Sequence, residues 1–259
     1  DQDWVDMVIS DVQDALTDTT LKDSSIIGVS SLTGEGLKDL VLEIQSVLDG
    51  IESRRDLGRP RLPIDRVFTI AGFGTVVTGT LMDGTLRLGQ DVEVVPSAVT
   101  ARIRGLQTHK QAVDSVGPGT RAAVNLAGTS HDSIRRGEVL TNPAWLTAAT
   151  ALDVRLTMIT GSPLPVRHNM SVMVHTGTSE TMARIRLLES DVVQPGETTW
   201  AQLKLEQSRA VLKGDYFVIR SNRATLGGGV VIDPKAKRHR RNSRSVLDGL
   251  SVMEKGTDQ

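Results

Sequence analysis

The chain has 259 residues, and its 30 basic and 31 acidic residues nearly cancel, so net charge gives no argument for a nucleic-acid partner. The absence of cysteine excludes disulfides and thiolate metal sites and fits a cytoplasmic location. No apolar run approaches the roughly 18 residues that a membrane span needs, and no signal peptide is present, so we expect no membrane partner. Because the chain begins with Asp1 rather than Met, we expect a fragment of a longer protein.

The first fifty residues have the pattern of the edge of an α/β sheet. Apolar residues recur at helical spacing from Trp4 to Leu16 and again from Leu37 to Leu48. The apolar residues Ile26, Ile27 and Val29 between them predict a short buried strand. A buried parallel strand needs neighbouring strands and covering helices, so we expect sequence to be missing upstream.

Residues 51–62 are predicted to be a linker, and two β-rich regions follow. Strands of the first region are predicted at Arg66–Ile70, Gly74–Leu81, Asp91–Val95, Thr100–Thr108, Arg121–Leu126 and Glu138–Leu140. Strands of the second region are predicted at Ala151–Ile159, Met170–Thr176, Met182–Leu188, Thr199–Leu205, Tyr216–Arg220 and Gly229–Ile232. Barrel closure would remove the edges that so many short strands otherwise expose. A helix is predicted at Ser245–Met253 in the basic tail that begins at Pro234. We expect this tail to be either a connector or a phosphate-binding segment.

Several stretches resemble the second and third domains of translational GTPases such as elongation factor Tu. The second-domain stretches are LPIDRVFTIAGFGTVVTGT at 62–80, AAVNLAG at 122–128 and IRRGEVL at 134–140. The third-domain stretches are VHTGTSETMARI at 174–185, AQLKLEQSRAVLKGDYFVIR at 201–220 and LGGGVVIDP at 226–234. The Asp65-Arg66 pair resembles the sequence of bacterial selenocysteine-specific elongation factors of the SelB type, whereas elongation factor Tu has two adjacent acidic residues there. The basic residue before Arg136 also resembles SelB, whereas elongation factor Tu has an acidic residue at that position.

The resemblance implies a mainly β fold, with two consecutive barrels preceded by the C-terminal edge of an α/β GTPase domain. The expected boundaries are 1–52 for the GTPase remnant, 53–62 for a linker, 63–145 for the second-domain barrel, 146–236 for the third-domain barrel, and 237–259 for a basic linker toward missing C-terminal domains.

Ser30, Ser31 and Leu32 resemble the last guanine-specificity loop of these GTPases. The P-loop pattern GxxxxGK[ST] is absent, and so is the Asn-Lys-x-Asp motif. We therefore expect GTP and Mg²⁺ to bind the full-length protein, with no cofactor and no GTPase activity in this chain alone.

The aminoacyl ligand that the resemblance implies requires a positively charged pocket. A selenol is far more acidic than a thiol, whose pKa is about 8.5, so a selenocysteyl ester presents a selenolate at neutral pH. Arg66 and one of Arg135 and Arg136 are the candidates for the fixed charge. Asp65 either receives the α-amino group or holds Arg66. The plainer alternative is that all three arginines are ordinary surface residues.

The resemblance also implies contacts with the tRNA arm at His175, Thr178, Ser179 and Gly228. His175 is equally compatible with a packed side chain beside a turn, and the Gly227–Gly229 run is also explained by close strand packing. His109, His131 and His168 lack metal-ligand spacing with one another, so no metal is expected. No nucleophile and base have the arrangement of a catalytic triad.

The implied function is that of a selenocysteine-specific elongation factor, which uses GTP to deliver selenocysteyl-tRNA to the ribosome at recoded UGA codons. An mRNA hairpin would bind the missing C-terminal domains, and the factor is expected to be a monomer. Three alternatives stay open, namely a general carrier of the elongation factor Tu type, the GTPase subunit of sulfate adenylyltransferase, and a stand-alone β-barrel interaction module. The Asp65-Arg66 pair disfavours a general carrier of the elongation factor Tu type. The aminoacyl-pocket residues and the His175–Thr178 sequence disfavour the sulfate adenylyltransferase subunit, which would need neither. The α/β edge at the start of the chain disfavours a stand-alone barrel module.

Overall fold

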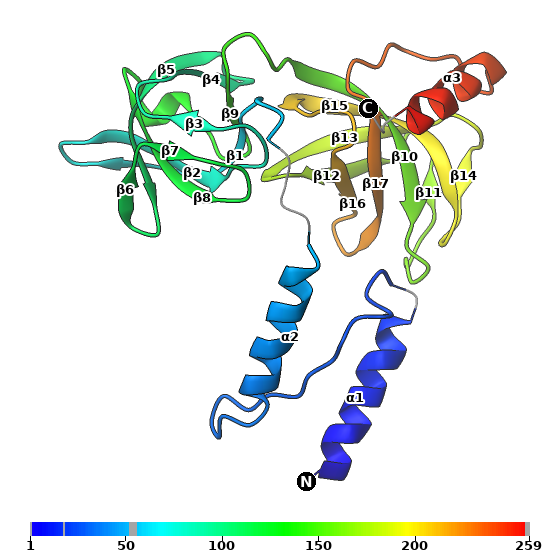
Figure 1. Ribbon diagram of the computed structural model, residues 1–259. Coiled ribbons are helices and arrows are strands. Elements are labelled where there is room, and N and C mark those ends of the chain that lie inside the picture. The colour runs from blue at the N-terminus through cyan, green and yellow to red at the C-terminus, as the bar shows by residue number, and fades with distance from the viewer. Residues whose placement is uncertain (1, 18, 52–55, 257–259) are drawn as a thin grey trace. The chain divides into compact units, whose positions relative to one another are not determined.

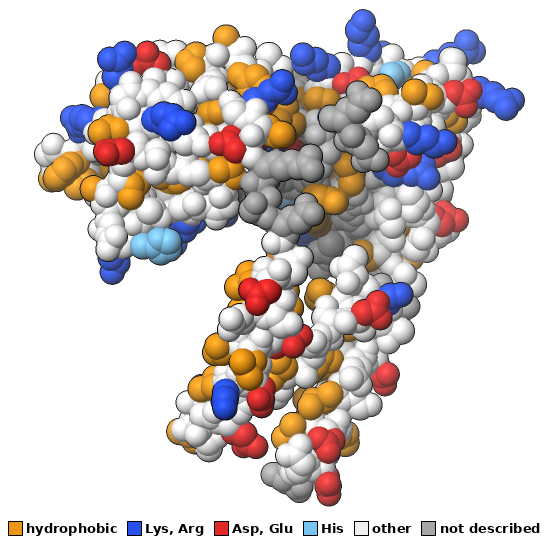
Figure 2. Space-filling view, in the orientation of Figure 1, with side chains coloured by type: hydrophobic (Ala, Val, Ile, Leu, Met, Phe, Trp, Pro, Cys, Tyr) orange, Lys and Arg blue, Asp and Glu red, His pale blue; other side chains and the backbone are white. Residues whose placement is uncertain are grey.

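The computed structural model describes residues 2–17, 19–51 and 56–256, and the chain divides into two compact units, residues 1–53 and 54–259 (Figure 1). The first unit contains the two predicted helices, α1 (Gln2–Leu16) and α2 (Leu37–Asp49). Their apolar stripes stay largely exposed, with Trp4 65% exposed and Leu48 61% exposed. Figure 2 shows hydrophobic side chains on the surface of both helices.

The buried strand predicted at Ile26, Ile27 and Val29 is wrong. Residues 24–30 have no regular secondary structure, and the Val29 side chain is 49% exposed. A strand is maintained by the hydrogen bonds of its ladder, and none of the described residues of the first unit forms a strand that could supply one. The apolar pattern therefore indicates that the side chains of this segment favour burial. The described residues of this unit form no sheet that the segment could join as a strand.

The second unit begins with a six-stranded closed barrel, called here the N-terminal barrel. Its strand order is β4-β9-β1-β2-β8-β5, and pairing of β4 with β5 closes it. Alternate residues such as Leu62, Ile64 and Val77 fill the core. The strands are β1 (Arg61–Ile70), β2 (Gly74–Thr80), β4 (Asp91–Val95), β5 (Val99–Thr108), β8 (Arg121–Ala127) and β9 (Val139–Thr141), with the shorter β3 (Leu86–Arg87), β6 (Gln111–Val113) and β7 (Ser115–Val116) and a 3-10 turn at His131–Ser133.

The C-terminal barrel is also closed and six-stranded, in the order β10-β15-β13-β12-β16-β17. Its core is built from residues such as Leu152, Ile185 and Leu203, which are fully buried. The strands are β10 (Ala148–Met158), β12 (Ser171–Thr176), β13 (Ser179–Leu187), β15 (Thr198–Ala210), β16 (Tyr216–Arg220) and β17 (Thr225–Asp233), with a two-stranded pair β11 (Val166–Arg167) and β14 (Val192–Val193). The mainly β fold with two consecutive barrels is confirmed.

The beginning of the N-terminal barrel differs from the prediction. Strand β1 starts at Arg61, five residues before the predicted start at Arg66. Its first residues pair with β9, including Pro63 opposite Val139. Residues 61 and 62 of the predicted linker 53–62 thus belong to a strand, and residues 53–55 lie outside the described residues. The other predicted strands are present, although their ends differ by several residues.

The basic tail packs against the C-terminal barrel. The predicted helix is present as α3 (Arg244–Lys255). Its buried Leu250 packs with Leu188, Trp200 and Ile232 of the barrel. Residues 234–256 are therefore held on the barrel by an apolar contact, which a solvated linker would lack.

Candidate functional site

A group of charged side chains lies on the outer face of the N-terminal barrel. Strand β1 has a bulge between Ile64 and Arg66. Ile64 is fully buried in the core, Asp65 is half-buried and Arg66 is exposed. The extra residue of a bulge interrupts the in-and-out alternation of a strand, so Asp65 and Arg66 both reach the outer face. Thr78 on β2, which pairs with Arg66, donates its hydroxyl hydrogen to Asp65 at 2.7 Å.

Arg121, the first residue of β8, completes this group. Its guanidinium donates two hydrogen bonds to the Asp65 carboxylate, at 2.5 and 3.1 Å. The Arg121 side chain is 54% exposed, so part of its charge faces solvent. We call Asp65, Arg66, Thr78 and Arg121 the Asp65 cluster. It places two arginines around one carboxylate on three adjacent strands.

The Asp65 cluster keeps its carboxylate ionised. Partial burial is the largest influence on the Asp65 pKa and opposes ionisation. The hydrogen bonds from Arg121 and Thr78, together with the charges of Arg121 and Arg66, outweigh it and lower the pKa below the ordinary value. At neutral pH the cluster therefore presents one fixed anion beside two cations.

An apolar cavity of about 660 Å³ lies beside the cluster on the same face, and we call it the outer cavity. Phe68 pairs with Val76, two residues along the strands from the pair of Arg66 with Thr78. Val76 pairs in turn with Asn125 on β8. The remaining lining residues are Ile70, Gly72, Phe73, Leu88, Arg104, Gly105, Leu106, Gln107, Ala112, Val113, Asp114 and Ala123. Exposed aromatic and aliphatic side chains next to charges are suited to a ligand with a flat apolar part and a charged part.

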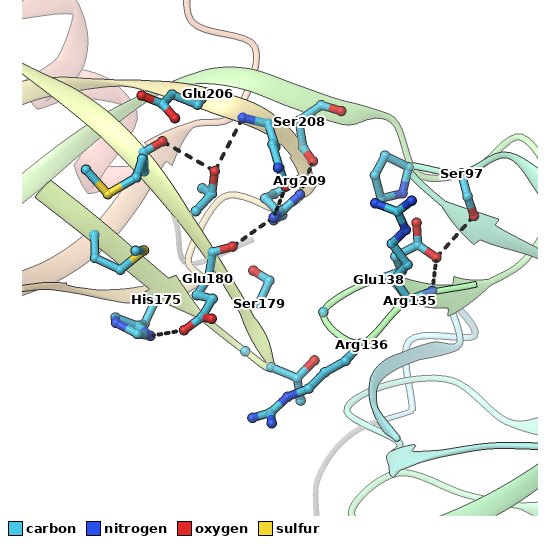
Figure 3. Close-up of a pocket in the computed structure, with 18 of the residues that line it drawn as sticks. Ser97, Arg135, Arg136, Glu138, His175, Ser179, Glu180, Glu206, Ser208 and Arg209 are labelled. Atoms are coloured by element: carbon cyan, nitrogen blue, oxygen red, sulfur yellow. Dashed lines mark hydrogen bonds and ion pairs between the residues drawn. The ribbon is translucent and has the colours of Figure 1, made fainter. Parts of the chain in front are cut away.

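A larger, polar cavity of about 1060 Å³ lies between the two barrels, and we call it the inter-barrel cavity. Its N-terminal-barrel wall is the turn Arg135-Arg136-Gly137. Glu138, which is buried, accepts a hydrogen bond from the Arg135 backbone N–H at 2.9 Å and one from the Ser97 hydroxyl at 3.2 Å. These bonds fix the turn, and Figure 3 shows Arg136 extending from it toward the Ser179 side of the cavity, where β13 begins.

The opposite wall comes from the β12–β13 hairpin and from β15. His175 lies 3.9 Å from Glu180, and Arg209 donates a hydrogen bond to the Glu180 backbone carbonyl (Figure 3). Two polar atoms here, the Thr178 hydroxyl and Arg209 Nε, are buried without a hydrogen-bond partner among the described residues. An unpaired buried polar group is costly, so this wall of the cavity carries two unsatisfied donors.

The four residues proposed for the aminoacyl pocket do not line one cavity. Arg135 and Arg136 line the inter-barrel cavity together with the three tRNA-contact candidates His175, Thr178 and Ser179. Asp65 and Arg66 are not among its lining residues; they lie on the outer face with Arg121. The sequence reasoning missed Arg121, although alternation along Arg121–Leu126 would have placed its side chain outward.

Two other predicted sites have a simple structural description. Gly228 does not line the inter-barrel cavity, and a Cβ atom there would lie 2.5 Å from the Phe217 carbonyl oxygen, so strand packing accounts for this glycine. In the guanine-loop candidate, Ser30 accepts hydrogen bonds from the Thr33 and Gly34 backbone N–H groups in a compact turn. Leu32 is 94% exposed at its tip.

Within the described part of the chain, no group of three or more histidines and carboxylates could hold a metal ion. No helix of the described residues is long and apolar enough to cross a membrane.

Two family models match the chain. Residues 74–141 match elongation factor Tu domain 2, and residues 153–238 match the β-barrel domain of selenocysteine-specific elongation factor. The first match lies within the N-terminal barrel, and the second covers most of the C-terminal barrel and the first residues of the basic tail. The domain boundaries proposed from the sequence stay predictions.

Two curated relatives match nearly the whole chain. A selenocysteine-specific elongation factor from Desulfomicrobium baculatum is 38% identical over 264 residues, covering 100% of this chain and 41% of the relative. Elongation factor Tu 2 from Streptomyces avermitilis is 28% identical, covering 89% of this chain and 63% of the relative. The chain thus spans well under half the length of the first relative.

Two solved structures share the fold. A bacterial selenocysteine-specific elongation factor EF-Sec superposes with a TM-score of 0.81 at 23% identity, covering 99% of this chain and 41% of that one. The translation elongation factor SelB from Methanococcus maripaludis, in its apo form, superposes with a TM-score of 0.78 at 24% identity, covering 89% of this chain and 54% of that one.

Proposed function

Because this chain is a homologue of selenocysteine-specific elongation factors along its whole length, we propose that it supplies the barrels with which such a factor holds selenocysteyl-tRNA. The observation that carries the proposal is the Asp65 cluster, where Arg66 and Arg121 flank an ionised carboxylate on the outer face of the N-terminal barrel.

The chemistry of the cluster matches a zwitterionic ligand. A selenocysteyl ester carries a selenolate and an α-ammonium group at neutral pH, whereas the seryl and cysteinyl esters keep mostly neutral side chains. Arg66 and Arg121 supply positive charge for the selenolate, and Asp65 supplies negative charge for the ammonium group. A charge pair at 4 Å contributes about 4 kcal/mol at an effective dielectric constant near 20, and desolvation offsets much of this. Even about 1.4 kcal/mol retained corresponds to tenfold selectivity.

The outer cavity gives the rest of the ligand a place to bind. The aminoacyl group of a charged tRNA is esterified to the terminal adenosine, so an apolar, partly aromatic cavity must lie beside the aminoacyl site. Phe68 and Val76 supply such a surface two residues along the strands from the cluster. A flat base packs well on apolar and aromatic side chains.

The inter-barrel cavity is suited to the phosphate backbone of the same RNA. Arg135 and Arg136 project into it from one barrel, and the unpaired Thr178 hydroxyl lies on the other. Arginine and hydroxyl groups are common donors to phosphate oxygens, and such contacts fix the position of an RNA without reading its sequence. We therefore propose that Arg135 and Arg136 bind the tRNA backbone, and that Arg66 and Arg121 bind the selenolate.

The full-length protein would use this surface in a GTP-dependent cycle. GTP and Mg²⁺ would bind a GTPase domain, to which Ser30, Ser31 and Leu32 would contribute the guanine loop. The factor would act in the cytoplasm as a monomer, deliver selenocysteyl-tRNA to the ribosome at UGA codons, and bind an mRNA hairpin through further C-terminal domains. This chain contains no P-loop pattern and would not hydrolyse GTP by itself.

The test compares one tRNA charged with selenocysteine or with serine, bound to the full-length protein with GTP. We expect Arg66→Gln and Arg121→Gln each to weaken selenocysteyl-tRNA binding about tenfold and to change seryl-tRNA binding little. Arg102→Gln is the matched control, since Arg102 is an exposed arginine of the same barrel, paired with Asp91 outside the cluster. Equal losses for both ligands would overturn the assignment of the selenol to this cluster.

A further inference from the structure

A third cavity, of about 590 Å³, lies on the C-terminal barrel beneath the basic tail, and we call it the tail cavity. Arg186 on β13 and Gln202 on β15 form part of its wall. The other lining residues are His168, Asn169, Leu188, Arg238, His239, Arg240 and Arg241. No carboxylate is among these described residues, although the chain as a whole carries one more acidic than basic residue. The excess positive charge is therefore local to this cavity.

Buried polar contacts hold the tail in place over the cavity. The imidazole of His239 lies 2.5 Å from Asp153, which is fully buried on β10. Gln202 donates hydrogen bonds to Asp153 at 2.9 Å and to the Lys237 backbone carbonyl at 2.8 Å. These contacts tie the tail to the barrel core, so the arginines on either side of His239 have defined positions.

Arg241 fixes the other side of the same segment. Its guanidinium donates to the Leu187 carbonyl at 3.2 Å and to the Ser190 carbonyl at 2.9 Å, and it pairs with Asp191 at 2.5 Å. Its charge is thus compensated, and its role is to anchor the tail.

Three other arginines of the cavity have no such compensation. Within the described part of the chain, the side chains of Arg186, Arg238 and Arg240 make no hydrogen bond or ion pair. Arg238 and Arg240 are exposed beside the pinned His239, and Arg186 is half-buried. Three unpaired guanidinium groups around a cavity of nucleotide size produce a positive potential that attracts anions.

We propose that the tail cavity is a second RNA-binding site, which holds the phosphate backbone of an RNA strand. Guanidinium groups present forked donors that match phosphate oxygens. The lining residues include no Phe, Tyr or Trp, so guanidinium contacts with the phosphate backbone are the main interaction that the cavity offers. It is separate from the inter-barrel cavity, with which it shares no lining residue.

An acidic peptide is the other anionic ligand that an arginine cluster can hold. The apolar lining residue Leu188 is 3% exposed and the C-terminal barrel is closed, so the cavity offers neither an apolar pocket for a peptide side chain nor a free barrel edge for a peptide strand. These two features favour the RNA backbone, which needs only donors to its phosphate oxygens.

The experiment measures binding of a fluorescent 12-nucleotide oligouridylate to the full-length protein by anisotropy at several salt concentrations. The test variant carries Arg186→Gln, Arg238→Gln and Arg240→Gln. Each lost phosphate contact reduces the slope of log affinity against log salt by about 0.7 for single-stranded RNA. We expect the slope to fall by about two and the affinity to drop about tenfold or more at low salt.

The control variant removes three positive charges elsewhere, through Arg87→Gln, Lys110→Gln and Arg223→Gln. It should keep most of the affinity and the slope, and thermal unfolding checks that both variants are folded. Equal losses in the two variants, or no loss in the first, would overturn the proposal. A site at which inorganic phosphate alone binds as tightly as the oligonucleotide would overturn it too, in favour of free phosphate.

A third variant separates this site from the tRNA surface proposed above. Arg135→Gln with Arg136→Gln removes charge from the inter-barrel cavity and leaves the tail cavity intact. If the tail site exists, adding its three substitutions to this background still lowers oligonucleotide affinity and slope by the same amounts. If the three tail-cavity substitutions no longer lower affinity and slope in this background, there is no second site. That outcome is independent of whether the Asp65 cluster binds the aminoacyl group.

Discussion

Arg61, the first residue of β1, forms an ion pair with Asp215 beside β16, in which one guanidinium nitrogen lies 2.7 and 2.8 Å from the two carboxylate oxygens. Only 12% of the Arg61 side chain and 17% of the Asp215 side chain are exposed. The pair links the two barrels at a point where water is largely excluded. It helps to set the barrel arrangement on which the inter-barrel cavity depends.

Removing one partner of this pair should destabilise the docked barrels. We expect Arg61→Met or Asp215→Ala to lower the free energy of unfolding by about 2–4 kcal/mol, because each leaves a largely buried charge unpaired. The double variant should be less destabilised than the sum of the two, since neither charge then remains alone. Denaturant unfolding of all four proteins measures this, and strictly additive losses would show that the two groups do not interact in solution.

Gly137 should be intolerant of a side chain for two independent reasons. Its φ of +89° is strained for other residues, and an added Cβ would lie 2.9 Å from the Ser179 Cα atom of the other barrel. Gly119 has a similar φ of +81°, but a Cβ added there would have no other atom within 4 Å, so Gly119 is the matched control. We expect Gly119→Ala to cost about 1 kcal/mol and Gly137→Ala clearly more. If denaturant unfolding gives similar losses of stability for the two variants, the barrels can move apart at Gly137 at little energetic cost.

Thr178 should matter for binding rather than for stability. Its buried hydroxyl has no partner among the described residues, so Thr178→Val removes an unsatisfied group and should leave the free energy of unfolding unchanged or slightly higher. If the hydroxyl contacts tRNA phosphate, the affinity for charged tRNA should fall about fivefold to tenfold.

Thr141→Val makes the same chemical change at a satisfied hydroxyl. Thr141 is fully buried and donates to the Pro60 carbonyl at 2.7 Å. This variant should lose about 1–3 kcal/mol of stability and keep its tRNA affinity. Unchanged tRNA binding in Thr178→Val, measured beside this control, would remove Thr178 from the RNA surface.

The sequence predicted the strands well because strand periodicity is a local property. It predicted the strand at Ile26–Val29 wrongly, because a strand also needs a partner that no local pattern reveals. The contact of Asp65 with Arg121 joins residues 56 positions apart, and it depends on a bulge and on the registers of β1, β2 and β8. The docking of the tail could not be predicted for a similar reason. The sequence of a basic segment is the same whether the segment is solvated or bound to the barrel through the contact of His239 with the buried Asp153.

Asp153 gives the stability of the protein a pH dependence of predictable sign. Burial raises its pKa above the ordinary value of 3.8, despite hydrogen bonds from His239 and Gln202 that act in the opposite direction, and the charge of Asp233 raises it further. Between 3.8 and the raised pKa the folded state binds more protons at this site than the unfolded state. The contribution of Asp153 to the free energy of unfolding therefore falls as the pH rises through this window.

The change Asp153→Asn removes this titration. We expect the free energy of unfolding of the unsubstituted protein minus that of the variant to decrease as the pH rises from about 4, and then to level off above the raised pKa. Asp91→Asn serves as a control of opposite sign, because the hydrogen bond from Arg102 lowers the Asp91 pKa and that difference should grow with rising pH. Urea unfolding from about pH 3 to pH 8 measures both, since the Asp91 window lies at and below about pH 4. A difference that grows with pH for Asp153 would show that His239 stabilises the carboxylate more than burial destabilises it.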